Sequence, residues 1–134
     1  MMTNGKLTFE LEGSRFAVSL FDKAAPKATC ALRARLPLDG QIVNAMWSGP
    51  VMLINDLDLG GAPLENPITF LAAGDIVYHP AHHQIGIAYA PTQFREPIGP
   101  VWVTFLGQVQ HNIDDLIEIG RNLQQTGAKH LYFR

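Results

Sequence analysis

Short segments in which apolar and polar residues alternate, separated by turn-forming residues, run along most of the 134-residue chain. Residues 6–12 and 15–21 both alternate in this way around a Gly-Ser turn, and they predict a β-hairpin. A later segment, residues 101–109, contains Gly107, which indicates a bulge or tight bend. Because strand–helix–strand alternation is missing, we expect a mainly β fold, a closed antiparallel barrel of about eight strands.

Two α-helices are expected to cover the open ends of this barrel. The first begins at Pro26, whose fixed φ suits a first helical turn. The second is expected to follow Asn112 as its N-cap and to stop at Gly127, with Gly120 leaving room for close approach. The short apolar segment at residues 130–134 predicts an edge strand.

Composition predicts one soluble domain over residues 1–134. Hydrophobic residues make up 47% of the chain, charged residues 16%, and the net charge is −2. The chain has no basic surplus of the kind that binds nucleic acid and no apolar run of about 18 residues that could span a membrane. We therefore expect no nucleic-acid partner, no membrane association and a cytoplasmic location. Cys30 is the only cysteine, which excludes an internal disulfide, and its alanine-rich surroundings predict a buried residue.

Three motifs resemble the cyclophilin-like proteins, in particular the small bacterial and archaeal members of unknown function. Residues 21–28, FDKAAPKA, resemble the opening of these domains, where a strand leads through an "APKT" motif into a helix. Residues 74–80, GDIVYHP, resemble their "GDVAYWPP" stretch, and residues 103–109 fit their last barrel strand. The resemblance covers residues 6–109, and it implies a cyclophilin-like barrel to which residues 110–134 add a helix and an edge strand.

The resemblance does not extend to the residues of prolyl isomerisation. In cyclophilins this activity depends on an arginine in a Phe-His-Arg segment after the first helix. The matching residues 43–49, VNAMWSG, hold no arginine, and the Gln-Gly-Gly-Asp segment that follows in cyclophilins is also missing. We therefore expect no isomerase activity, since a fold does not carry an activity with it.

Three histidines lie in the predicted turn between two apolar segments, residues 76–78 and 85–89. Imidazoles of His79, His82 and His83 could bind zinc, but spacing in a turn does not fix a coordination geometry. The acidic residues considered as spatial neighbours are Asp75 and Glu96. We therefore predict no metal and no cofactor; an exposed polar turn, or one histidine serving as an acid–base group in a pocket, are the other interpretations.

Aromatic residues near this turn suggest a ligand-binding cleft, because tyrosine and tryptophan combine apolar surface with a polar group. Each of them could equally be part of the core, and Arg95 could equally form a surface salt bridge with Glu96. Trp102 and Phe105 are expected in the core. The candidate ligand-binding residues are Trp47, Tyr78, His79, His82, Tyr89 and Arg95.

Three hypotheses for function follow. The first is a module that binds a small molecule or short peptide in this cleft without isomerase activity. The second is an enzyme, a hydrolase or lyase of a small polar metabolite, with His79 or His82 as acid or base. The third is a non-catalytic subunit whose C-terminal helix and edge strand pack against a partner or a second copy, with Ile113, Leu116 and Leu123 of the helix in the interface. The ligand and the reaction stay open at this point.

Overall fold

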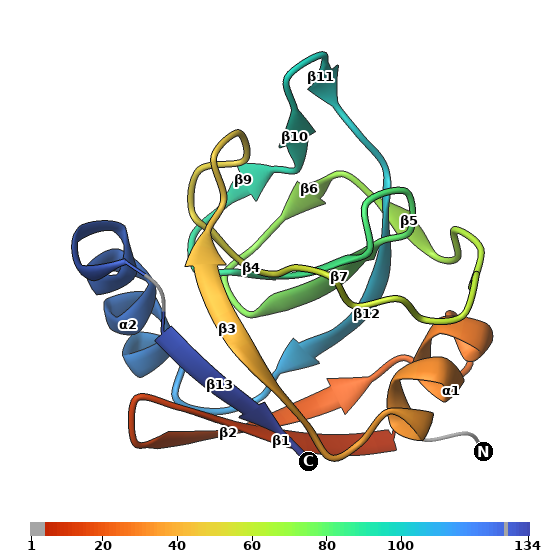
Figure 1. Cartoon of the computed structure of the whole chain (residues 1–134), viewed down its shortest axis with the longest axis horizontal. Helices are drawn as coiled ribbons and strands as arrows, with labels where there is room; N and C mark the ends of the chain where they lie inside the picture. Colours follow the sequence, from red (N-terminus) through yellow and green to blue (C-terminus); the bar gives the residue numbers. More distant parts are fainter. Residues whose placement is uncertain (1–4, 128) are drawn as a thin grey trace.

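The alternating segments join edge to edge into a closed antiparallel barrel (Figure 1). The computed structural model describes residues 5–127 and 129–134. The barrel strands are β1 (Gly5–Leu11), β2 (Ser14–Leu20), β3 (Leu38–Asn44), β4 (Val51–Ile54), β7 (Asp75–His79), β8 (Gln84–Ala88), β12 (Val103–Val109) and β13 (Lys129–Phe133). Their order is β2-β1-β13-β3-β4-β8-β7-β12, and β12 pairs back onto β2. The predicted closed barrel of about eight strands is therefore confirmed.

The remaining strands are two-residue pieces in the connecting segments. They are β5 (Pro67–Ile68), β6 (Phe70–Leu71), β9 (Thr92–Gln93), β10 (Arg95–Glu96) and β11 (Gly99–Pro100). β5 pairs with β12, β6 with β9, and β10 with β11. Figure 1 shows β10 and β11 as a small hairpin that extends beyond one end of the barrel.

The predicted irregularity at Gly107 is confirmed. The register between β12 and β7 shifts between Phe105 and Gly107. A Cβ on Gly107 would lie 2.4 Å from the Ser19 carbonyl oxygen of β2, so only glycine lets the two strands approach this closely. The bulge therefore lies where β12, still paired with β7 on one edge, begins to pair with β2 on the other edge and closes the barrel.

The prediction that residues 130–134 form an edge strand is wrong. β13 pairs with β1 on one side and with β3 on the other, from Phe9↔Phe133 to Lys129↔Ile42. The C-terminal segment is thus an integral barrel strand and not an addition to a barrel that is already closed. A strand's own residues do not state whether one or both of its edges are paired, because that depends on its neighbours in space.

The two helices are α1 (Pro26–Ala34) and α2 (Ile113–Thr126). Gly127 ends α2 as predicted, and its N–H donates to the Leu123 carbonyl at 3.0 Å. Asn112 is the N-cap residue as predicted, but its side chain makes no cap hydrogen bond, because the residue has a left-handed φ of 61° and its amide donates to the Arg15 carbonyl. Within residues 5–127 and 129–134, no helix combines the length and apolar character needed to cross a membrane.

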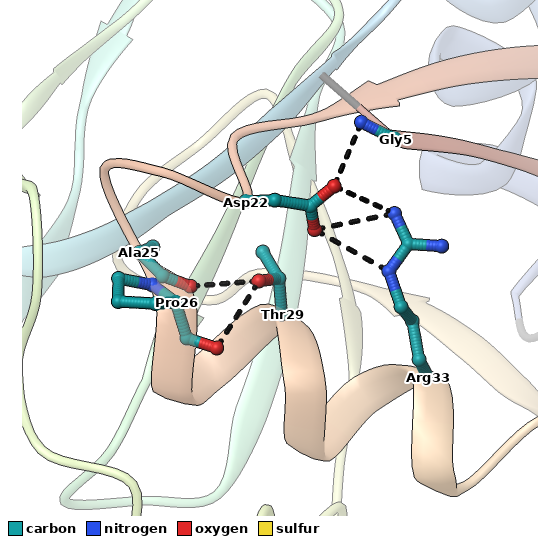
Figure 2. A network of polar contacts seen from close by, with 6 residues as sticks. All are labelled: Gly5, Asp22, Ala25, Pro26, Thr29 and Arg33. Carbon is teal, nitrogen blue, oxygen red and sulfur yellow. Dashed lines mark hydrogen bonds and ion pairs between the residues drawn. The ribbon is translucent and has the colours of Figure 1, made fainter. Parts of the chain in front are cut away.

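Helix α1 is attached to the barrel by a network around Asp22 (Figure 2). The Asp22 carboxylate forms a two-pronged ion pair with the Arg33 guanidinium, with a shortest distance of 2.9 Å, and accepts a hydrogen bond from the Gly5 N–H at 2.7 Å. At the first turn, the Thr29 hydroxyl donates to the Ala25 carbonyl at 2.8 Å. The Glu65 carboxylate accepts from two N–H groups at the start of α1, those of residues 27 and 28, which satisfies donors that a helix N-terminus leaves free.

The barrel interior is filled by the inward face of each strand. Phe9 of β1 stacks on Phe16 of β2, with ring centroids 4.9 Å apart, and contacts Phe133 of β13 at 5.3 Å. Leu116 and Leu123 of α2 belong to the same core and are buried. These two leucines are therefore occupied within the chain and cannot supply the oligomer interface for which they were considered.

A second apolar core lies against the outer face of β4, β7, β8 and β12. Successive side chains of a strand point to opposite faces, so Met52 joins the interior core while Leu53 joins the outer one. Phe94 and Leu71, from the segments that carry the two-residue strands, cover this outer face. Both faces of these strands are buried as a result, which explains why their sequences read as continuous apolar runs.

Three expectations about individual side chains do not hold. Cys30 is exposed on α1, and Trp102 is 60% exposed, so neither is a core residue. Phe105 is only partly buried, packing against the outer core and edge-on to Phe21 at 4.8 Å. An isolated segment does not reveal which of its apolar side chains the neighbouring elements will cover.

Candidate functional site

The turn with three histidines is a β-hairpin turn, as predicted. It connects β7 to β8, and His79 at the end of β7 pairs with Gln84 at the start of β8. The His82 N–H donates to the His79 carbonyl at 3.3 Å, and His83 has a left-handed φ of 54°. This fold of the turn brings the rings of His79 and His82 to a centroid distance of 4.7 Å.

Glu96 of β10 completes a cluster with these two histidines. One carboxylate oxygen, Oε1, lies 3.1 Å from His79 Nδ1 and 3.8 Å from His82 Nε2. His83 points elsewhere, with its Nε2 4.0 Å from Asp58. Of the two acidic residues considered from the sequence, Glu96 therefore approaches the histidines, whereas Asp75 accepts hydrogen bonds from Ala72 and Gln108.

His79 is almost completely buried, in contact with the edge of the Phe94 ring at 5.5 Å. Burial lowers the pKa of His79 below its usual value, and His82 lowers it further, whereas the nearby Glu96 carboxylate opposes the shift. The buried Nδ1 atom neither donates nor accepts a hydrogen bond of acceptable geometry among the described residues, although Glu96 Oε1 lies 3.1 Å away. A polar atom in this position calls for an explanation, because buried polar groups are almost always paired.

A pocket of about 260 Å³ adjoins the cluster. Its apolar floor comes from the outer core, from Val43, Leu53 and Phe94. The other lining residues are Asn44, Ala45, Met46, Trp47, Ser48, Asn55, Gln84, Arg95 and Glu96. The pocket thus offers a flat aromatic surface, amide groups, a cation and an anion within one small volume.

The buried Ser48 joins the two segments that form the pocket wall. Its hydroxyl accepts a hydrogen bond from the Arg95 N–H at 2.8 Å and contacts the Arg95 carbonyl as donor at 3.1 Å. The Thr92 hydroxyl donates to the Ser48 carbonyl at 2.6 Å. The β3–β4 loop is therefore held directly against β9 and β10, which fixes the backbone next to Glu96.

The structure separates the six candidate ligand-binding residues into three groups. Trp47 and Arg95 line the pocket, and His79 and His82 contact the Glu96 carboxylate on its wall. Tyr78 and Tyr89 lie in the barrel interior. The expectation that one cleft collects all six side chains is therefore wrong.

The two interior tyrosines have structural partners. The Tyr78 hydroxyl accepts a hydrogen bond from the Leu59 N–H at 3.2 Å, and the Tyr89 hydroxyl donates to Asn44 at 2.6 Å. Sequence reasoning named neither Ser48 nor Gln84 as pocket residues. Gln84 directly follows the histidines, and the alternation of side chains along β8 would have placed it on the outer face. Nothing in the sequence around Ser48 indicates its contacts with Arg95.

The fold and the site define a small closed antiparallel barrel with a polar pocket on its outer face. The model of the family described as Protein of unknown function (DUF3830) matches residues 7–134, and the chain belongs to this family. No functionally curated protein is significantly similar in sequence.

Solved structures that are similar in fold include the following two. McbB, solved in complex with tryptophan, is 18% identical with a TM-score of 0.75; the match covers 96% of this chain and 44% of McbB, so the chain spans less than half of that protein. The hypothetical protein AF2241 from Archaeoglobus fulgidus, solved in solution, is 16% identical with a TM-score of 0.63, covering 100% of this chain and 96% of the other. At these identities the likeness concerns the fold alone.

Proposed function

We propose that this protein binds a small polar molecule carrying a carboxylate in the pocket beside Arg95. The observation that carries the proposal is the composition of the pocket wall, in which Arg95, Glu96 and the half-exposed Trp47 meet. A guanidinium binds a carboxylate through two parallel hydrogen bonds, and an indole offers a flat surface to an apolar group. The ligand class is therefore a compact anion or zwitterion with an apolar portion.

The charges of the pocket favour a zwitterion over a simple anion. Arg95 donates to the Gln93 side chain at 3.3 Å, and within the described part of the chain no carboxylate pairs with it. Glu96 would repel a pure anion but attract an amino group. An amino acid satisfies both charges, and McbB, whose structure holds tryptophan, makes that amino acid a reasonable member of the first panel of ligands.

Thermal unfolding with a panel of amino acids, keto acids and short peptides tests the proposal. We expect at least one carboxylate ligand to raise the melting temperature of the wild type, and Arg95→Gln to abolish the increase. Arg121→Gln, which removes an exposed arginine from α2, is the matched control and should keep it. An increase that survives Arg95→Gln, or a panel without any effect, contradicts the proposal.

Binding is favoured over catalysis by histidine because of where His79 lies. Its side chain is buried behind Glu96 and does not line the pocket, so a ligand there meets the carboxylate first. A hydrolase or lyase with His79 as its acid or base would need that carboxylate to move aside.

Absence of prolyl isomerase activity is part of the proposal. The pocket includes residues 43–48, the segment that corresponds in position to the isomerase segment of cyclophilins, and none of these residues is an arginine. Arg95 lines the same pocket from another segment and supplies a guanidinium there, so an assay of prolyl isomerase activity is a real test of this expectation. We expect isomerisation of a proline-containing peptide at the uncatalysed rate, and a rate above it would overturn this part.

Association into a homo-oligomer also remains a proposal, and its surface must lie outside the buried leucines of α2. The exposed large apolar side chains lie elsewhere in the chain, at Met46, Trp47, Leu64, Phe70, Ile98 and Trp102. Light scattering of the purified chain distinguishes a monomer from a dimer, and a monomer at high concentration excludes the oligomer.

A further inference from the structure

We propose that His79, His82 and Glu96 form a binding site for a divalent transition-metal ion, and that zinc is its best occupant. The site would use Nδ1 of His79, Nε2 of His82 and a carboxylate oxygen of Glu96. It lies beside the pocket and does not depend on the pocket's binding a carboxylate ligand. Two imidazoles and one carboxylate are a donor set typical of zinc sites that keep a position open for water or a ligand.

The distances fit this assignment. One donor atom from each residue lies within 4.8 Å of the others, and Glu96 Oε1 lies 3.1 Å and 3.8 Å from the two ring nitrogens. Zinc bonds of about 2.0–2.1 Å in a tetrahedron place neighbouring donor atoms about 3.3 Å apart. The separation between Glu96 and His79 is close to this value, whereas that between Glu96 and His82 is longer, so the exposed His82 side chain would have to move toward the ion to complete the set.

The buried Nδ1 atom of His79 supplies an independent observation. It is inaccessible to solvent, and no hydrogen bond from the described residues satisfies it although the Glu96 oxygen lies at 3.1 Å. A simple His–Glu pair would be expected to align the ring N–H with the carboxylate. A metal ion between the two atoms would satisfy both without that alignment, because each would direct a lone pair at the ion.

The backbone holds the three donors in place without the metal. His79 and His82 belong to one tight turn, linked by the hydrogen bond between their backbone groups. Glu96 belongs to the β10–β11 hairpin, whose neighbouring residue Arg95 is bonded on both backbone groups to Ser48. A site whose donors are held before binding loses less conformational entropy when the ion arrives.

The donor types select the metal. Imidazole nitrogens suit zinc, copper, nickel and iron, whereas calcium and magnesium prefer sites made of oxygen atoms. His82 is exposed, with 57% of its side chain accessible, so the ion would remain in contact with solvent on that side. Glu96 also lines the pocket, which places the ion next to the space where a small molecule would bind.

Calorimetric titration of the metal-free full-length chain with zinc chloride tests the site. We expect one ion per chain, with affinity lowered at least about tenfold by His82→Ala or Glu96→Gln. His83→Ala and His130→Ala are the matched controls, since both residues are exposed histidines outside the cluster, and they should bind zinc as the wild type does. His82 is exposed, so His82→Ala should fold normally, as circular dichroism can verify.

Cobalt(II) provides a second readout, because its visible absorption is strong in a tetrahedral protein site and weak for the hydrated ion. We expect absorption bands in the wild type that His82→Ala removes and His83→Ala keeps. No zinc binding by the wild type, or equal losses in the His82 and His83 variants, overturns the assignment. Arg95→Gln should leave zinc binding intact, so failure of the ligand proposal and failure of the metal proposal give different results.

Discussion

The ring of Tyr89 packs directly on the backbone of Gly120, so that a Cβ on Gly120 would lie 2.3 Å from ring atom Cγ. This contact fixes the distance between α2 and the end of β8. We expect Gly120→Ala to destabilise the protein by about 1–3 kcal/mol, because overpacking outweighs the better helix propensity of alanine. Urea unfolding measures the change, and Glu118→Ala at an exposed position of α2 is the control, expected to be neutral or slightly stabilising.

The hydroxyl of the same tyrosine links three elements. It donates to Asn44 of β3 at 2.6 Å and accepts from Gln124 of α2, and Asn44 in turn donates to the carbonyls of Ala45 and Gly49 in the pocket loop. Tyr89→Phe removes the two hydrogen bonds of the hydroxyl while keeping the ring, and we expect the free energy of unfolding to fall by about 0.5–1.5 kcal/mol.

Denaturant unfolding of Tyr89→Phe beside Tyr132→Phe measures this effect. Tyr132 lies on β13 with its ring in contact with the Arg134 guanidinium, so its variant retains the ring contact and should unfold close to the wild type. An equal loss of unfolding free energy in both variants would show that the hydrogen bonds of the Tyr89 hydroxyl do not stabilise the fold.

The ion pair between Asp22 and Arg33 in Figure 2 also carries the hydrogen bond from Gly5. Asp22→Asn weakens both interactions, and because the pair is partly exposed we expect a cost of about 1 kcal/mol. The cost should shrink in high salt, since mobile ions screen the charge–charge component. Urea unfolding of Asp22→Asn at low and high salt measures this, with Asp39→Asn as the control. If the loss of unfolding free energy is the same at both salt concentrations, hydrogen bonding alone accounts for it.

The alternating segments were sufficient to predict the barrel because alternation is a local property. In the two segments that predicted the hairpin, the apolar residues of one face, such as Phe9 and Phe16, are buried. The role of β13 was not predictable in the same way, because its pairing with both β1 and β3 is decided by strands at the other end of the sequence. Trp102 was misplaced for a related reason: nothing in its own segment states that no element covers it.

The sequence identified the histidine turn but not the set of side chains that the structure brings together beside it. The histidine turn gathers His79 and His82, but Glu96 arrives from a separate hairpin that the sequence shows only as a loop. Tyr78 and His79 are adjacent on β7, so their side chains point to opposite faces, and the burial of one inside the barrel directs the other outward. That rule was available from the sequence and would have removed Tyr78 from the cleft.

We expect Ser48 to be a positioning residue for the proposed metal site at His79, His82 and Glu96. Its hydroxyl pairs with both backbone groups of Arg95, and Ser48→Ala would leave these groups without that partner, at a cost of about 1–3 kcal/mol. Because Arg95 precedes Glu96, we also expect zinc affinity to fall, by about tenfold.

A matched variant separates this positioning effect from a general loss of stability. Thr92→Val removes the 2.6 Å hydrogen bond to the Ser48 carbonyl but leaves the contacts to Arg95 in place. We expect Thr92→Val to lower the unfolding free energy while zinc titration, performed where both variants are folded, gives the wild-type affinity. Similar zinc affinities for the two variants would show that the position of Glu96 does not depend on the Ser48 hydroxyl, because the β10–β11 hairpin would then hold the carboxylate without it.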